Sequence, residues 1–398
     1  MRALRHARTA LLVALVATSG SVGCLGLGKG PFPVLTDERV QGKKSSPRVR
    51  LAWHRVVNHG GKAPYRPVES ASPALDPARG RIYVGATNGA LLAFDAQGRQ
   101  LFSHHIEESI EAEPALDAKR RVLYVGTGDG KLRAIHADTG ALLWDADVGF
   151  PLDGAPLLAG DALYFATTDD GVVAVSKKDG ATLFSYRRPR GEDFHIRGRS
   201  GLTLVGDLLL AGFDDGAIVA LDASDGSVRW LYDTSNDLPD TRGKRPSFGD
   251  VDTTPVVIDG VVYAASFSAG LYKLDLESGS VLDRDPTKKG VTSLVAVDKT
   301  LLVVSPNTGL VAIDTTQDKV LWTRPRERGA LSTPVCTETG VVLYGETPGS
   351  FVAVDLYTGR ELARLESSEG FSAKAATAWN LAAVLSNSGT LYTFAIED

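Results

Sequence analysis

Short apolar runs separated by glycine-containing turns make up most of the chain from about residue 74 onward. In segments such as 131–136 apolar and polar positions alternate with a period of two, while runs such as 122–126 are continuously apolar. Asp-Gly and Asn-Gly pairs separate these segments, and such pairs tolerate the positive φ angles that let two strands reverse tightly. The pattern predicts many short antiparallel strands and an all-β chain.

A repeat close to Gly-x-Leu-x-Ala-x-Asp-x-x-x-Gly-x-x-Leu-Trp organises these segments. The fullest copies span residues 130–144 and 216–230. The first glycine of each copy recurs with spacings of 41, 41, 45, 54, 39, 40 and 40 residues, at Gly89, Gly130, Gly171, Gly216, Gly270, Gly309, Gly349 and Gly389. A period near 40 residues with four short strands per unit predicts an eight-bladed β-propeller. A single blade cannot bury both faces of its sheet, so neighbouring blades must stack around an axis.

The last copy of the repeat ends at Asp398, before a fourth strand could form. The tripeptide Leu51-Ala52-Trp53 matches Leu142-Leu143-Trp144 and Val320-Leu321-Trp322, the expected fourth-strand ends of other copies, although it precedes the first complete repeat. We therefore expect residues 48–57 to supply the outer strand of the last blade. This strand would close the ring and leave no open ring end.

The first 23 residues are predicted to be a secretory signal peptide, because three arginines precede a short apolar run that ends in small residues. Val22-Gly23-Cys24 resembles a lipoprotein cleavage site, which implies acylation of Cys24. An ordinary signal peptide cut near Gly23 is the alternative. Residues 24–47 are expected to form the lipidated cysteine and a flexible tether, and residues 48–398 the propeller. The apolar run is too short to span a bilayer.

Composition narrows the classes of function. The chain has 398 residues, 43 Lys and Arg against 48 Asp and Glu, and a formal net charge of −5, so a nucleic-acid partner held by phosphate contacts is not expected. Only two cysteines occur, Cys24 and Cys336, and no stabilising disulfide is expected. Cys336 is interpreted as a small buried apolar side chain of an inner strand.

The usual signatures of catalysis and metal binding are not found. His104 and His105 are adjacent in a predicted strand, where successive side chains point to opposite faces, so they are not expected to share a metal. The glycine-rich segment 126–131 joins two strands rather than opening a helix, which indicates a turn and not a phosphate loop. Several acidic turn residues would lie on one face and could bind calcium, but Asp before Gly is also ordinary turn chemistry; they are Asp129, Asp169, Asp170, Asp214 and Asp215.

Two connections are longer than the repeat requires. The spacing of 54 residues leaves an insertion at 233–246, followed by the segment 247–255. A smaller excess lies at 187–200. Both join the fourth strand of one blade to the first strand of the next, so we expect them to emerge side by side on the same face. Loops on a rigid ring are where a propeller places its binding residues.

At these two segments the chain resembles the family of the bacterial outer-membrane assembly factor BamB, a lipoprotein with repeats of the type found in pyrroloquinoline-quinone dehydrogenases. The resemblance implies that Phe194, Ile196 and Arg197, together with Asp250 and Asp252, bind the periplasmic domains of a BamA-like subunit. Phe194 stands where the family has a leucine. The apolar pair would be buried against the partner, and the charged groups would give directional hydrogen bonds. Alternatively, Phe194 and Ile196 enter the core and the two aspartates pair with Arg197.

The resemblance implies a non-enzymatic scaffold without a cofactor, anchored by lipid to the periplasmic face of the outer membrane and assisting insertion of outer-membrane proteins. Unfolded outer-membrane proteins would be possible clients. Two other functions stay open: a quinone-dependent dehydrogenase, whose adjacent cysteine pair this sequence lacks, and an envelope propeller that binds polysaccharide or peptide. Inner-membrane sorting is also an open alternative, although Leu25 replaces the aspartate that usually signals it.

Overall fold

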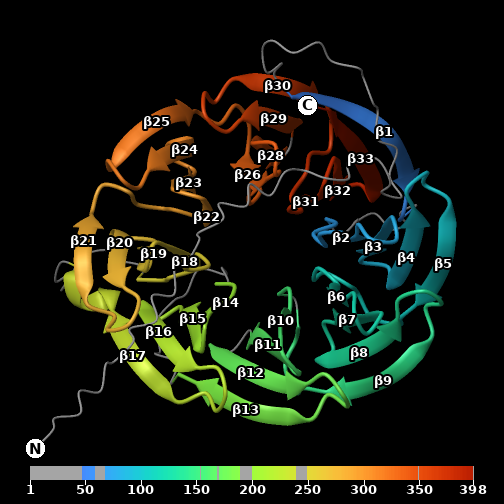
Figure 1. Ribbon diagram of the computed structural model, residues 1–398, viewed down its shortest axis with the longest axis horizontal. Helices are drawn as coiled ribbons and strands as arrows, with labels where there is room; N and C mark the ends of the chain where they lie inside the picture. The colour runs from blue at the N-terminus through green and yellow to red at the C-terminus, as the bar shows by residue number, and fades with distance from the viewer. Residues whose placement is uncertain are drawn as a thin grey trace, which may run out of the picture.

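The strands form a closed ring of sheets around a central axis (Figure 1). The structure is a computed structural model that describes residues 47–58, 68–152, 154–167, 170–188, 200–238, 249–347 and 349–397. Over these residues eight antiparallel sheets follow one another around the ring, seven of four strands and one of five. The predicted eight-bladed β-propeller is confirmed. No helix of the described residues has the length and apolar character needed to cross a membrane.

Seven blades run from an inner to an outer strand in chain order, and the last blade takes its outer strand from residues 48–56. The first four blades comprise β2 (Ala74–Asp76), β3 (Arg81–Gly85), β4 (Ala90–Asp95) and β5 (Gln100–His105); β6 (Ala115–Asp117), β7 (Val122–Gly126), β8 (Lys131–His136) and β9 (Leu142–Asp147); β10 (Leu157–Ala159), β11 (Ala162–Thr167), β12 (Gly171–Ser176) and β13 (Thr182–Arg187); and β14 (Thr203–Val205), β15 (Leu208–Gly212), β16 (Ala217–Asp222) and β17 (Val228–Asp233).

The short 3₁₀-helix η1 (Thr234–Asp237) follows the fourth blade. The remaining blades comprise β18 (Val256–Ile258), β19 (Val261–Ser266), β20 (Gly270–Asp275) and β21 (Val281–Asp285); β22 (Ser293–Val297), β23 (Thr300–Ser305), β24 (Gly309–Asp314) and β25 (Lys319–Arg324); β26 (Ala330–Leu331), β27 (Val335–Cys336), β28 (Val341–Thr347), β29 (Phe351–Asp355) and β30 (Glu361–Leu365); and β31 (Ala376–Ala378), β32 (Leu381–Leu385), β33 (Thr390–Glu397) and β1 (Arg48–Val56).

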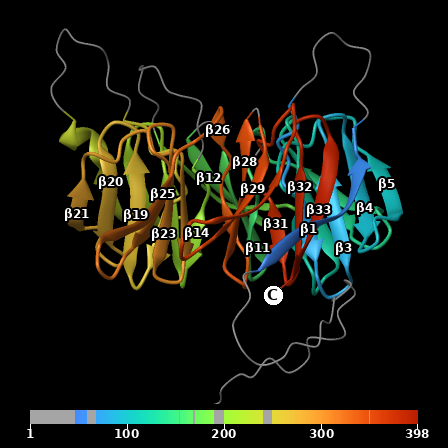
Figure 2. The same cartoon turned by 90° about the horizontal axis from the view of Figure 1, so that it is seen from above.

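The first strand of the propeller completes its last blade, as the sequence predicts. β1 pairs antiparallel with β33, from Arg48 opposite Glu397 to Val56 opposite Thr390. The register shifts at a bulge between Leu51 and Trp53. Because the two strands come from opposite ends of the described chain, this pairing closes the ring (Figure 2).

The hydrophobic core is divided among the junctions between blades. Eight clusters of buried side chains are found, each built from two neighbouring blades. Within β11, Leu163 and Phe165 pack toward the second blade while Tyr164 packs toward the fourth. Successive side chains of a strand point to opposite faces, so one apolar strand serves two junctions. This explains why the middle strands are almost continuously apolar.

Aromatic side chains near the start of the outer strands link each blade to the next. The indole of Trp53 covers Gly98 of the first blade, where an added Cβ would lie 2.7 Å from the ring, and the φ of this glycine is +77°. Similar aromatic–glycine contacts occur at five further junctions, between Phe102 and Gly140, Trp144 and Gly180, Phe184 and Gly226, Trp230 and Gly279, and Trp322 and Gly359. Any side chain at these glycines would displace the ring.

Three of these tryptophans also donate a hydrogen bond to the neighbouring blade. The indole nitrogens of Trp53, Trp230 and Trp322 lie 2.9, 2.8 and 2.7 Å from the carbonyl oxygens of Ala96, Leu276 and Leu356. The corresponding carbonyl at the junction of the second and third blades belongs to Lys177, and it accepts instead from the Tyr124 hydroxyl at 3.3 Å. Within the described chain, the indole N–H of Trp144 has no acceptor. This junction therefore departs from the pattern.

The two faces of the ring carry different connections. Backbone bonds of 2.7 and 3.0 Å join Ile106 to Gly89 and Thr234 to Gly216, so the turns between second and third strands lie beside the connections that link blades. We call this side the upper face. The lower face carries the other turns within the blades, and the C-terminus lies there (Figure 2). β1 begins on the lower face, because Arg48 pairs with Glu397.

Several smaller expectations concern single residues. His104 and His105 lie in β5, and Cys336 lies in β27. The Cys336 thiol is half-buried rather than fully buried, and burial raises its pKa to about 11. The segment 126–131 is a turn between β7 and β8. The predicted leader, tether and lipidation site, residues 1–23, 24–46 and Cys24, lie outside the described residues, and those domain boundaries stay predictions.

The tryptophan hydrogen bonds give a first prediction. We expect Trp322→Phe to lower the free energy of unfolding by about 1–3 kcal/mol, because it leaves the Leu356 carbonyl without its donor. Trp144→Phe removes the same ring atoms without breaking a hydrogen bond and should cost less. Urea unfolding of both variants measures the difference, and an equal or larger cost for Trp144→Phe would contradict the assignment.

Ring closure gives a second prediction. Deletion of residues 48–57 should lower the melting temperature sharply, because β33 would become an unpaired edge and Phe394 and Ile396 would lose cover. Deletion of residues 30–39, in the predicted tether, is the matched control and should leave the melting temperature unchanged. Thermal unfolding followed by circular dichroism measures both. An unaltered melting curve for the first deletion would show that β1 is dispensable.

Candidate functional site

The two long connections predicted from the repeat spacing meet on the upper face. One follows β13 and the other follows β17, so both are connections between blades. The Ser200 hydroxyl donates to the carbonyl of Thr253 at 3.1 Å, and the backbone N–H of Gly201 donates to the Thr254 hydroxyl at 2.9 Å. The described ends of the two connections are therefore hydrogen-bonded to each other, as expected of neighbouring connections, while residues 189–199 and 239–248 lie outside the described residues.

Glycine allows this close approach. A Cβ at Gly212 would lie 2.3 Å from the carbonyl oxygen of Val251, and one at Gly201 would lie 2.5 Å from the Thr254 hydroxyl. The Ser200 hydroxyl also accepts from the Gly212 backbone at 3.0 Å. The segment around Val251 is thus pressed against the fourth blade, which fixes the backbone on both sides of Asp250 and Asp252.

Four carboxylates come together beside this contact. Asp250 and Asp252 stand before β18, while Asp170 and Asp214 belong to the turns that follow β11 and β15. The Asp214 backbone N–H lies 3.3 Å from Asp170 Oδ1. We call Asp170, Asp214, Asp250 and Asp252 the acidic cluster. The acidic cluster is supplied by turns of the third and fourth blades and by the connection that leads to the fifth. The sequence predicted Asp170 and Asp214 as acidic turn residues and Asp250 and Asp252 as partner-binding residues, but did not bring the two pairs together.

Asp252 lies in an environment that disfavours its ionised form. Its side chain is half-buried, and its Oδ1 atom is buried with no hydrogen-bond partner among the described residues. Burial raises the pKa of Asp252 to about 7, and the negative charges of Asp214, Asp250 and Asp170 act in the same direction. Asp250 is almost fully buried, at 2% exposure, and its carbonyl accepts from the Phe267 backbone at 2.8 Å. Of the two predicted aspartates, Asp252 has the more accessible surface.

A second group of side chains holds the base of the longer connection. The Asp237 carboxylate, at the end of η1, accepts from the hydroxyls of Tyr232 and Tyr272 at 2.6 and 2.8 Å. Arg284 forms an ion pair with the same carboxylate at 3.5 Å. Burial and the Asp237 carboxylate raise the pKa of Tyr232 to about 12, which keeps its proton available for this bond. Sequence reasoning missed this group, because its members come from four separate elements.

The two ends of that connection are also tied together. The Thr234 hydroxyl donates to the Gly216 carbonyl at 2.8 Å, and the Ser266 hydroxyl donates to the Gly249 carbonyl at 2.8 Å. At the start of the shorter connection, the Arg188 guanidinium contacts Asp215 at 2.5 Å. Both connections therefore leave the ring from rigid positions, which favours a preorganised surface.

The other predicted site residues lie elsewhere. Phe194, Ile196 and Arg197 fall outside the described residues, so their contacts stay predictions. Asp129 bonds its own turn, through the Thr127 hydroxyl at 2.5 Å and the Lys131 backbone at 3.3 Å. Across the described ranges no group of three or more His, Cys, Asp or Glu side chains could hold a metal ion.

Comparison with known proteins agrees with this architecture. A family profile described as outer membrane protein assembly factor BamB matches residues 87–324 and 271–397. The protein of that name from Burkholderia pseudomallei is 28% identical over 351 residues, covering 87% of this chain and 88% of that protein. Its counterpart from Yersinia pestis is 24% identical over 262 residues, covering 66% of each chain.

Solved structures show the same fold. BamB from Moraxella catarrhalis superposes with a TM-score of 0.71 at 22% identity, over 87% of this chain and 99% of that chain. Quinohemoprotein alcohol dehydrogenase from Comamonas testosteroni superposes with a TM-score of 0.64 at 16% identity, over 87% of this chain and 76% of that chain. The eight-bladed ring is thus shared by proteins of different function. Since the profile match extends over most of the propeller, the chain belongs to the outer membrane protein assembly factor BamB family.

Proposed function

We propose that this protein is a non-enzymatic scaffold of the outer-membrane β-barrel assembly machinery, and that the acidic cluster binds a basic segment of a BamA-like subunit. The family and its relatives carry the name of outer membrane protein assembly factors, which supports the assembly role. The observation that carries the binding site is the carboxylate of Asp252, which has a buried oxygen without a donor among the described residues, beside the hydrogen-bonded ends of the two connections.

The charge of the acidic cluster defines the partner. The negative charges of Asp214, Asp250 and Asp170 disfavour the ionised form of Asp252, so a cation or a donor placed beside Asp252 would be favoured. An arginine of the partner could donate a charged hydrogen bond to the accessible part of the Asp252 carboxylate. Asp250, being buried, would support the backbone of this segment rather than contact the partner directly. Phe194, Ile196 and Arg197 are proposed to extend the contact with an apolar anchor and a cation.

The proposed location follows from the predicted leader. Lipidation at Cys24 would anchor the protein to the periplasmic face of the outer membrane, and unfolded outer-membrane proteins would be its clients. A quinone-dependent dehydrogenase is the rival, because such an enzyme shares the ring. The adjacent cysteines expected of that class are missing from the sequence, whose two cysteines stand at positions 24 and 336.

Co-purification tests the proposed partner. We expect Asp252→Lys, alone or with Arg197→Glu, to reduce recovery of a BamA-like protein from solubilised membranes at least tenfold, because it places a cation where a cation should bind. Asp207→Lys is the matched control, since Asp207 is an exposed acid in a lower-face turn of the neighbouring blade. Unchanged recovery with Asp252→Lys would overturn the binding site, and recovery of no assembly component by the unaltered protein would overturn the function.

The raised pKa of Asp252 leads to a further prediction: replacing its carboxylate with an uncharged group should stabilise the protein in a pH-dependent way. The pKa of Asp252 is raised from 3.8 to about 7, so the folded protein loses stability relative to an uncharged variant as pH rises through this range. Asp252→Asn should raise the melting temperature at pH 8 by roughly 2–4 °C and leave it unchanged near pH 4. Asp207→Asn should show no such difference. Equal melting temperatures of Asp252→Asn and the unaltered protein at pH 8 would contradict the raised pKa.

A further inference from the structure

A pocket on the lower face is lined by Trp144, the tryptophan that departs from the hydrogen-bonding pattern. Its volume is about 570 Å³, within the range of small-ligand sites. It lies at the junction of the second and third blades, far from the acidic cluster on the upper face. Arg120 and Asp161 come from turns between first and second strands, and Lys177 and Lys178 come from the turn between β12 and β13.

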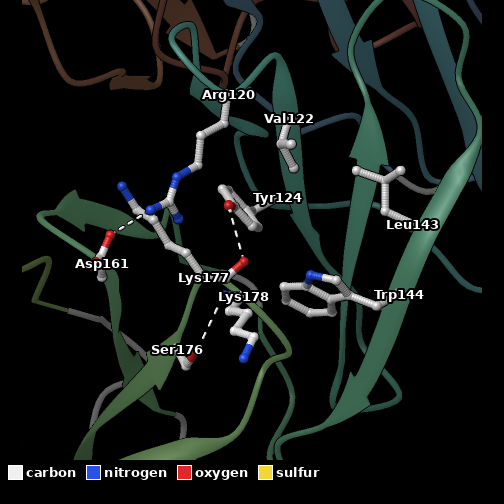
Figure 3. Close-up of a pocket in the computed structure, with 9 residues that line it drawn as sticks. All are labelled: Arg120, Val122, Tyr124, Leu143, Trp144, Asp161, Ser176, Lys177 and Lys178. Atoms are coloured by element: carbon white, nitrogen blue, oxygen red, sulfur yellow. Dashed lines mark hydrogen bonds and ion pairs between the residues drawn. The ribbon is translucent and has the colours of Figure 1, made fainter.

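One wall of this pocket is apolar. Val122 and the half-exposed Leu143 lie beside the indole of Trp144, and Leu143 keeps 50% of its surface exposed. Figure 3 shows the indole nitrogen of Trp144 directed toward the space between Tyr124 and Leu143. The ring centroids of Tyr124 and Trp144 lie 5.9 Å apart. The Lys177 carbonyl accepts a hydrogen bond from the Tyr124 hydroxyl instead of from the Trp144 indole. The Trp144 indole N–H can therefore donate to a ligand.

The polar wall of the pocket has more positively charged side chains than negatively charged ones. Arg120 pairs with Asp161, and Lys177 lies 3.2 Å from Asp117. Lys178 is exposed and forms no ion pair with any described residue. Lys119 and Arg121 flank Arg120 on the same turn, and Arg121 is paired with Asp138. The pocket thus offers an unpaired ammonium and an unpaired indole donor, and both need an acceptor.

We propose that this pocket binds the phosphate headgroup of an anionic membrane lipid. The phosphate oxygens would accept from Lys178, Arg120 and the Trp144 indole, while the glycerol and the first acyl carbons would cover Leu143 and Val122. A purely inorganic anion would leave the apolar wall uncovered. At the other three tryptophan junctions the indole N–H is already bonded to a carbonyl, so it is not available to a phosphate.

The position of the pocket on the lower face favours a lipid as the ligand. β1 begins on that face at Arg48, so a tether preceding it would lead from the membrane to this side of the ring. This choice rests on the membrane attachment in the proposed function. With the lower face toward the bilayer, the acidic cluster on the upper face would stay open to a protein partner.

Titration with a soluble short-chain lipid tests this inference. The full chain in a nonionic detergent is titrated with dihexanoyl phosphatidylglycerol while the indole N–H signals are followed by NMR. The Trp144 signal, assigned with Trp144→Phe, should shift saturably, and the signals of Trp53, Trp230 and Trp322 should stay in place. Lys178→Glu should weaken binding at least tenfold. Lys299→Glu, at another exposed lower-face lysine, is the matched control and should bind normally.

Two further titrations identify the source of the phosphate. Inorganic phosphate should bind at least tenfold more weakly than the lipid, because it leaves the apolar wall uncovered, and dihexanoyl phosphatidylcholine should bind more weakly because its headgroup carries a cation. Equal binding of inorganic phosphate would overturn the lipid assignment. Absence of a Trp144 shift with phosphatidylglycerol would overturn the site itself. Neither result affects co-purification of the upper-face partner, so the two proposals fail independently.

Discussion

The packing of an aromatic ring on a glycine of the next blade is the interaction on which the ring depends. It occurs at six of the eight junctions in the described structure, and in each case the glycine has a positive φ. The aromatic ring takes the space that a side chain would fill, so the turn and the outer strand can approach only if that residue is glycine. The contact therefore fixes both the spacing and the rotation between neighbouring blades.

At one junction without an aromatic–glycine contact, an ion-pair bridge takes its place. Between the fifth and sixth blades, Lys273 bridges Asp283 and Asp318 at 3.0 and 2.9 Å, at the positions where other blades place the aromatic ring and the glycine. Asp318 keeps the positive φ of the glycines, at 52°. Between the second and third blades the aromatic ring is present, but its indole N–H has no carbonyl acceptor among the described residues, and a pocket lies beside it. Small changes in one contact thus alter the surface without disturbing the ring.

The ring holds its acidic cluster at a cost to stability. Three successive blades bring four carboxylates together on the upper face, and the pKa of Asp252 rises because burial and like charges disfavour its ionised form. The surrounding hydrogen bonds of Ser200, Thr234 and Ser266 hold the segment in place despite this repulsion. Such strain is typical of residues kept for binding rather than for folding.

The sequence by itself determined the architecture, the number of blades, the closing strand and the two irregular connections, because these depend on local periodicity, turn chemistry and repeat spacing. Leu51-Ala52-Trp53 could be assigned to the last blade because it repeats a local pattern. Spacing could not show that Asp170 and Asp214 lie beside Asp252, that Asp237 binds two tyrosines, or that Trp144 loses its acceptor to Tyr124. Only the tertiary structure decided these contacts, since each joins side chains of different strands or blades whose distance depends on how the sheets pack around the axis.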